Sequence, residues 1–226
     1  MTIYRETVEF VDRFNRPQAY TTTPGQNGWT IADTSSGGAP TYLNATEDGG
    51  KAVLTLANDT EVENVCLFHN DVLMFDLAHI HKYWAIIKVA AVGATTVVAA
   101  GLGNARADDE DTVGVSAWFK MEGAASTSAL VVETDDDTTN SDDVATGESL
   151  AAVYKKLEID FQNGLADVRF LIDGDRVAAG TTFDMSAVSS GQNVQPIFQI
   201  SKGSTSGTPA LHIAEVGIRY TQFYGA

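Results

Sequence analysis

Three polar side chains at alternate positions offer the clearest catalytic possibility in the sequence: Glu158, Asp160 and Gln162. Alternate residues of a β-strand project from the same face, so these side chains would form a row. Glycoside hydrolysis with retention needs two carboxyl groups about 5–5.5 Å apart, a spacing that such a row can provide. The third side chain of the row, Gln162, is an amide and cannot donate a proton as a carboxylic acid does. The row therefore favours a solvated polar strand face, and we expect no catalytic residues.

Two other groups of side chains could bind metal ions. His79 and His81 would lie on one face of a strand, but no third ligand is evident nearby. Acidic residues gather at Asp108-Asp109-Glu110-Asp111, at Asp135-Asp136-Asp137 and at Asp142-Asp143. Their oxygens could coordinate calcium, although their spacing matches no calcium-binding loop. We expect solvated loops here, with no metal and no cofactor.

Motifs of the common enzyme classes are absent. The chain has no Gly-x-Ser-x-Gly, no phosphate-binding loop, no His-Glu-x-x-His and no dinucleotide fingerprint. Cys66 is the only cysteine, so an intramolecular disulfide is impossible, and its apolar neighbours predict a buried thiol. These absences lead us to expect a protein that is not an enzyme.

Charge and hydropathy bear on the partners. Asp and Glu number 30 against 14 Lys and Arg, and the net charge of −16 disfavours nucleic acid and anionic membranes. The first residues lack the basic and apolar regions of a signal peptide, which predicts synthesis in the cytoplasm. Residues 83–102 nearly reach the length of a membrane span, but Lys88 and Gly93 favour a buried hairpin turning near Gly93-Ala94.

Period-two alternation predicts the fold class. It is clearest in a meander with strands over 153–161, 165–172 and 176–181, joined by turns at Asn163-Gly164 and Asp173-Gly174. A break in the alternation near Glu215 indicates a bulge in the last strand. The polar stretches 15–28, 104–112 and 135–149 are expected to be loops. About a dozen strands without a helical period predict one all-β domain over residues 1–226, a jelly-roll sandwich of two antiparallel sheets.

The second half of the chain, residues 80–222, resembles concanavalin-A-like and laminin-G-like jelly rolls. The resemblance rests on the strands W-A-I-I-K-V (84–89) and V-G-V-S-A-W-F (113–119), on the meander K-L-E-I-D-F with V-R-F-L-I-D-G-D-R-V, and on L-H-I-A-E-V-G-I-R-Y near the end. Glucanases of this superfamily carry a pattern resembling E-x-D-x-E or E-x-D-x-x-E. Here Gln162 or Asn163 stands in place of the last carboxylate, so the resemblance implies that the acid/base partner is missing. The same arrangement looks like the sandwiches that decorate or cement the capsids of tailed phages.

The phage resemblance implies a non-enzymatic virion structural protein, a capsid decoration protein on the major capsid protein, often trimeric. The alternatives are a carbohydrate-binding jelly roll with a surface glycan as ligand, and a degenerate glucanase. Residues 1–28 could be an extended arm that adds a strand to a neighbouring copy. Its apolar residues would make the assembly contact: Ile3, Tyr4, Val8, Phe10 and Phe14. The other possibility is that residues 3–14 form the first strand of their own sandwich.

Overall fold

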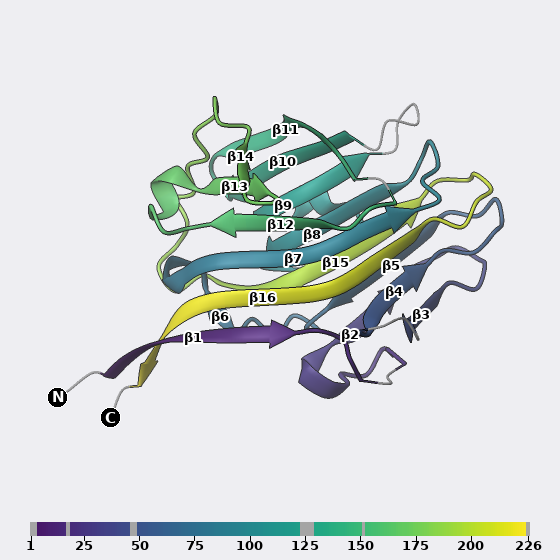
Figure 1. Ribbon diagram of the computed structural model, residues 1–226, viewed down its shortest axis with the longest axis horizontal. Coiled ribbons are helices and arrows are strands. Elements are labelled where there is room, and N and C mark those ends of the chain that lie inside the picture. The colour runs from purple at the N-terminus through teal and green to yellow at the C-terminus, as the bar shows by residue number, and fades with distance from the viewer. Residues whose placement is uncertain (1–3, 17–18, 46–48, 123–128, 151, 225–226) are drawn as a thin grey trace.

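The computed structural model describes residues 4–16, 19–45, 49–122, 129–150 and 152–224 (Figure 1). Sheet A contains β1 (Tyr4–Asp12), β3 (Thr41–Ala45), β4 (Lys51–Thr55), β7 (Ile80–Ala90), β12 (Lys155–Asp160), β13 (Arg169–Ile172), β14 (Asp175–Val177) and β16 (Ala210–Tyr224). Sheet B contains β2 (Thr30–Asp33), β5 (Glu63–Phe68), β6 (Phe75–Asp76), β8 (Val97–Gly103), β9 (Val115–Glu122), β10 (Ala129–Asp136), β11 (Asn140–Ser149) and β15 (Asn193–Lys202). Short 3-10 turns lie at η1 (Gln26–Gly28), η2 (Leu77–His79), η3 (Glu110–Thr112) and η5 (Leu165–Asp167).

The strand order is that of a sandwich built by long-range pairing. In sheet A it is β14-β13-β12-β7-β16-β4-β3, with β1 beside β16, and in sheet B it is β11-β10-β9-β8-β15-β5-β2, with β6 beside β15. All the pairings are antiparallel. The predicted all-β jelly-roll sandwich of two antiparallel sheets is therefore confirmed. Among the described residues, no helix is long and apolar enough to cross a membrane.

Alternate side chains of both sheets meet in one hydrophobic core. Phe119 of sheet B and Phe170 of sheet A touch edge to face, with ring centroids 5.2 Å apart. Phe183 packs against Phe170 at 4.9 Å, so aromatic contacts join the two layers. The other side chains of each strand point away from this core, and those on the outer face of sheet B form the candidate site.

The central meander follows the prediction in its order but not in all its bounds, since β14 covers Asp175–Val177 and not residues 176–181. β12, β13 and β14 pair in sequence, and the turn at Asp173-Gly174 has φ of 54° and 94°. Such positive φ values at both turn residues suit a tight hairpin. The second strand begins at Arg169 rather than residue 165, because residues 165–167 form η5. The bulge expected near Glu215 is confirmed by the register shift between Ile213 and Glu215.

Two other expectations are wrong. The polar stretch 135–149 is mostly strand, since β11 pairs with β10 at the edge of sheet B. An edge strand with exposed side chains needs no apolar face, so its polarity resembled that of a loop. Residues 83–102 are strands, as expected, but not a hairpin, because β7 and β8 belong to different sheets. Alternation indicates a strand and does not tell which partner it takes.

The N-terminal segment lies along its own chain. β1 pairs with β16 from Tyr4 opposite Tyr224 to Asp12 opposite Val216, and the two strands project together from the body of the sandwich (Figure 1). Phe10 contacts Phe75, and Phe14 is buried in the core. Ile3 lies outside the described residues. This is the arrangement of a first strand, and an assembly contact through these residues stays a prediction.

Candidate functional site

The Glu158 row lies on the outer face of sheet A, but it is not a catalytic pair. Glu158 is 5% exposed, and its Oε1 lies 3.0 Å from Nζ of Lys82 and 2.9 Å from Nζ of Lys156. Burial raises the pKa of Glu158, but the hydrogen bonds from the two lysines outweigh burial and hold that pKa below its usual value. Asp160 accepts a hydrogen bond from the backbone N–H of Gln162 at 2.8 Å. One carboxylate is thus ion-paired and the other stabilises a turn.

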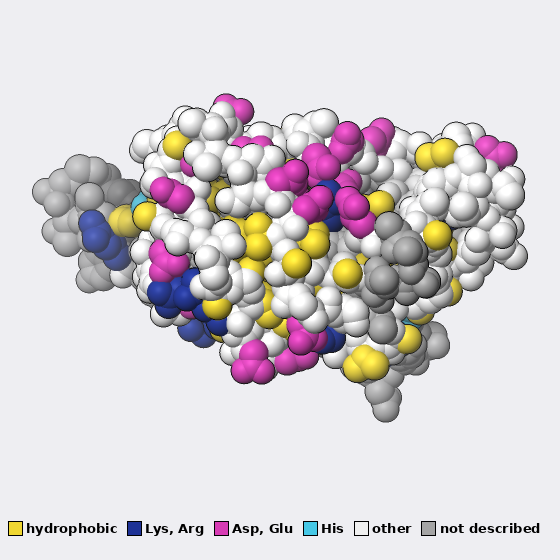
Figure 2. Space-filling model, turned by 90° about the horizontal axis from the view of Figure 1, so that it is seen from above, with side chains coloured by type: hydrophobic (Ala, Val, Ile, Leu, Met, Phe, Trp, Pro, Cys, Tyr) yellow, Lys and Arg dark blue, Asp and Glu magenta, His cyan; other side chains and the backbone are white. Residues whose placement is uncertain are grey.

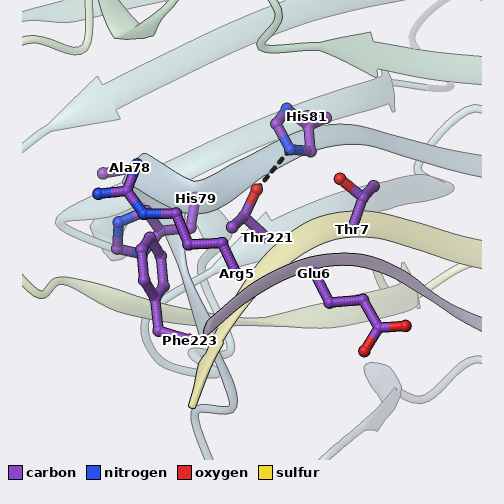
Figure 3. Close-up of a pocket in the computed structure, with 8 residues that line it drawn as sticks. All are labelled: Arg5, Glu6, Thr7, Ala78, His79, His81, Thr221 and Phe223. Carbon is purple, nitrogen blue, oxygen red and sulfur yellow. Dashed lines mark hydrogen bonds between the residues drawn. The ribbon is translucent and has the colours of Figure 1, made fainter. Parts of the chain in front are cut away.

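The two histidines line one pocket without sharing a strand. His79 ends the turn η2, with Nδ1 3.2 Å from Asp76 Oδ2, and His81 is in β7, with Nε2 2.8 Å from Thr221 Oγ1. The pocket measures about 420 Å³ and also contacts Arg5 and Phe223 at the end of the β1–β16 pair (Figure 3). The expectation that they share one strand face is wrong for His79. Among the described residues, the group of three side chains that could hold a metal ion contains neither histidine.

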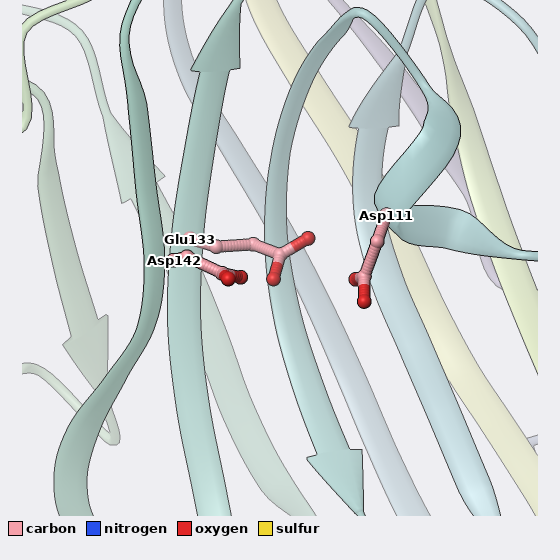
Figure 4. A group of neighbouring side chains, drawn as sticks. All are labelled: Asp111, Glu133 and Asp142. Atoms are coloured by element: carbon pink, nitrogen blue, oxygen red, sulfur yellow. The ribbon is translucent and has the colours of Figure 1, made fainter.

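The structure joins two acidic clusters that are separate in the sequence. Asp111 lies in the loop between β8 and β9, and Asp142 lies on the edge strand β11. Glu133 of β10 stands between them, and carboxylate oxygens of all three lie within 4.8 Å of one another (Figure 4). Sequence reasoning missed Glu133, although a carboxylate inside the apolar strand run 129–134 was a usable signal. Asp136 instead shapes the β10–β11 turn by accepting hydrogen bonds from the backbone of Thr138 and Thr139.

A buried lysine stands inside this acidic group, which includes further carboxylates. Nζ of Lys120 lies 2.6 Å from Asp111, 3.1 Å from Glu122, 3.6 Å from Asp143, 3.8 Å from Glu133 and 4.0 Å from Glu110. Figure 2 shows acidic side chains gathered around a basic one on the side of the molecule where β11 lies. Burial lowers the pKa of Lys120, but the surrounding carboxylates raise that pKa by more. The pKa of Glu133 is raised to about 8, chiefly by burial.

The loop between β8 and β9 is fastened across the outer face of sheet B. The carbonyl of Asp108 accepts hydrogen bonds from Asn64 at 2.9 Å and from Gln199 at 3.0 Å. Arg106 forms an ion pair with Asp108 and donates to Thr34 Oγ1 at 3.0 Å. A second hydrophobic cluster is buried on this face: Cys66, Phe68, Val113, Trp118 and Ile197. The predicted buried thiol is therefore confirmed, and burial raises the pKa of Cys66 to about 12.

A cleft of about 470 Å³ opens beside this loop. Strands β5, β8 and β15 contribute Asn64, Val97 and Ser201, and the loop contributes Asp108 and Asp109. The side-chain oxygen of Asn64 is buried and has no hydrogen-bond partner among the described residues. The cleft thus combines hydroxyl, amide and carboxylate groups with an apolar surface, which suits a polar ligand that also has apolar faces.

Lys202 fixes one wall of this cleft. Its side chain is 1% exposed, and Nζ donates to the carbonyls of Ala57 and Asp59, each at 2.8 Å, and to Asp59 Oδ1 at 3.0 Å. Glu63, wholly buried, lies 3.7 Å from the same ammonium, and burial raises the pKa of Glu63. The charge of Lys202 is therefore used inside the protein, where it holds the wall in place.

Comparisons with known proteins show the fold. No family model matches the sequence, and no curated protein matches it. A glycoside hydrolase family 16 protein from the mixed-linkage glucan locus of Bacteroides ovatus superposes with a TM-score of 0.62 at 13% identity, over 95% of this chain and 99% of the other. The Bacillus licheniformis β-glucanase gives 0.61 at 14%, over 95% and 98%. The carbohydrate recognition domain of Emp47p gives 0.58 at 10%, over 90% and 93%.

These comparisons correct the functional expectation. The three structures named above are described as glycoside hydrolases of the glucanase type and as a carbohydrate recognition domain, and none of the three is described as a phage capsid protein. The expected capsid decoration protein is therefore wrong, and the expectation that the protein is not an enzyme is wrong as well, since glycoside hydrolases are among its structural neighbours. The virion location stays a prediction. At 10–14% identity the likeness establishes the jelly roll. What this chain does must be argued from its own surface.

Proposed function

We propose that this protein binds carbohydrate in the cleft on the outer face of sheet B. The observation that carries the proposal is the convergence of Asn64, Asp109 and Ser201 around the apolar Val97 in a space of about 470 Å³. Sugar hydroxyls donate and accept hydrogen bonds, so the hydroxyl of Ser201 and the carboxylates of Asp108 and Asp109 are suitable partners. The glucanases and the recognition domain with the same fold support this choice of ligand class.

The charge of the site narrows the ligand to neutral glycans. Asp108 and Asp109 line the cleft, and the one lysine in its lining is buried and already paired. The whole chain carries a net charge of −16. A uronic acid or sulfated chain would meet like charge at close range, whereas a neutral oligosaccharide would not. We therefore expect neutral gluco-oligosaccharides to bind better than acidic ones.

Calorimetric titration with neutral and acidic oligosaccharides tests this function. Ser201→Trp should fill the cleft and abolish binding, because Ser201 lines it and is only partly buried. Thr41→Trp, on an exposed position of β3 in the other sheet, is the matched control and should bind as the unmodified protein does. Binding that survives Ser201→Trp would refute this cleft as the site, and absence of binding to the whole panel would refute the function.

Glycoside hydrolysis is the second candidate, and the acidic group on the same face favours it. The oxygens of Asp111, Glu133 and Asp142 lie within 4.8 Å of one another. A retaining mechanism needs two carboxyl groups only about 5–5.5 Å apart, so carboxylates gathered this closely are candidates for such a pair. Release of reducing sugar from β-glucans, lost in Glu133→Gln and kept in Ser201→Thr, would establish it. No release from any glucan that binds would refute it.

A further inference from the structure

We propose that Asp111, Glu133 and Asp142 form a binding site for a calcium ion that ties the β8–β9 loop to the edge of sheet B. The three ligands come from three separate elements: η3 in the loop, β10 and β11. Figure 4 shows Glu133 and Asp142 side by side, both directed toward Asp111. An ion held by all three would connect the loop to two strands that it does not pair with.

Glu133 supplies an observation independent of the acidic cluster. It is 4% exposed, and its Oε2 has no hydrogen-bond partner among the described residues. Lys120 is the nearest cation, but its Nζ lies 3.8 Å from this oxygen and makes closer contacts with Asp111 and Glu122. A buried carboxylate oxygen without a hydrogen bond is costly, and an ion placed between it and Asp142 would satisfy it.

The excess of negative charge around the site favours the binding of a second cation. Six carboxylates surround the site: Glu110, Asp111, Glu122, Glu133, Asp142 and Asp143. Lys120 is the one cation with an ion pair to them among the described residues. One ammonium does not balance the negative charge of this group, and a divalent ion would offset two further negative charges.

The chemistry of the ligands selects calcium. All three ligands are carboxylates, the hard oxygen donors that Ca²⁺ and Mg²⁺ prefer. Ca²⁺ accepts a flexible set of oxygen ligands, whereas Mg²⁺ demands near-ideal octahedral geometry, so carboxylates from three separate elements suit calcium better. Asp111 and Asp142 are exposed, which gives the ion a path from solvent and positions for water ligands.

Titration of calcium into chelator-treated full-length protein tests the proposal. We expect one site with a dissociation constant of about 10⁻⁵–10⁻³ M. At ten to a hundred times that concentration, Tm should rise by about 3–11 °C. Magnesium should raise Tm by less, since it demands near-ideal octahedral geometry and gives up its water ligands reluctantly.

Two variants distinguish calcium binding at these three ligands from general screening of the negative charge of the protein. Asp142→Asn removes an exposed ligand, should fold normally and should weaken calcium binding by at least about tenfold. Asp175→Asn, an exposed residue of β14 in sheet A, removes the same charge elsewhere and should leave the affinity unchanged. No heat of binding and no rise in Tm would overturn the proposal, as would equal effects of Ca²⁺ and Mg²⁺ or an Asp142→Asn protein that responds like the unmodified one. The test needs no glycan, so it is independent of the proposed carbohydrate binding.

Discussion

His69 should make the protein sensitive to mild acid, and replacing it with phenylalanine should remove that sensitivity. The imidazole is 2% exposed, and neither ring nitrogen has a hydrogen-bond partner among the described residues. It packs against Trp29, with ring centroids 4.3 Å apart, and edge-on against Phe10 at 5.6 Å. A charged ring in this aromatic pocket would lose its hydration without gaining a partner.

The magnitude follows from the pKa. Burial lowers the pKa of His69 to about 4 from the ordinary 6.5, against a smaller opposing effect of the Asp12 carboxylate. The unfolded chain therefore binds the proton first, so the stability from the neutral ring is complete above about pH 6.5 and is lost as pH falls toward 4. Each pKa unit corresponds to about 1.4 kcal/mol, so between pH 7.5 and pH 4.5 this group should cost about 2–3 kcal/mol of unfolding free energy.

Urea denaturation at the two pH values measures this difference. Phenylalanine keeps the aromatic contacts and leaves no polar atom unpaired, so His69→Phe at pH 7.5 should differ from the unmodified protein by less than about 1.5 kcal/mol. Carboxylates also titrate in this range, but they do so in both proteins, and the comparison cancels them. If His69→Phe loses as much stability at pH 4.5 as the unmodified protein does, the ring is not held neutral by burial and the reasoning fails.

Three further predictions concern packing and the sandwich edge. Lys202→Met should destabilise the protein by about 3–5 kcal/mol, because it leaves the buried Glu63 without its cation, and thermal denaturation should show this as a lower Tm. Gly217→Ala should cost about 1–3 kcal/mol, since its new methyl group would lie 2.1 Å from the Trp84 ring, and the cost should shrink in a Trp84→Leu background, as a double-mutant cycle would reveal. Deletion of residues 1–14 should lower stability by several kcal/mol, because it removes the partner of β16 and takes Phe14 from the core; a deleted protein that melts like the full chain would contradict the pairing.

Patterns of neighbouring residues were sufficient to predict most strands and turns of the sheets, but not to predict the candidate site. The alternation around Leu157 and Ile159, and the turn at Asp173-Gly174, depend on neighbouring residues and appear in the structure as predicted. β11 was missed because an edge strand buries little, so selection for burial leaves no pattern in it.

The candidate site depends on contacts between distant residues. Asp111 and Asp142 belong to different polar stretches, and only the strand order β9-β10-β11 brings them together around Glu133. In the same way, the ion pairs of Glu158 with Lys82 come from the pairing of β12 with β7, which the sequence of either strand does not specify. Spacing along the chain was informative where the chemistry is local and misleading where the sheets determine the neighbours.

The position of β16 has a consequence for how the chain folds as it is synthesised. This strand pairs with β1, β4 and β7, all of which leave the ribosome more than a hundred residues earlier. Until residues 210–224 emerge, sheet A has a gap at its centre, with β7 and β4 each lacking a partner. At about 5–20 residues per second, these edges stay open for several seconds during translation. Such open edges can pair with other chains, so yield in cells should depend on chaperones and on growth temperature more than on the final stability of the sandwich.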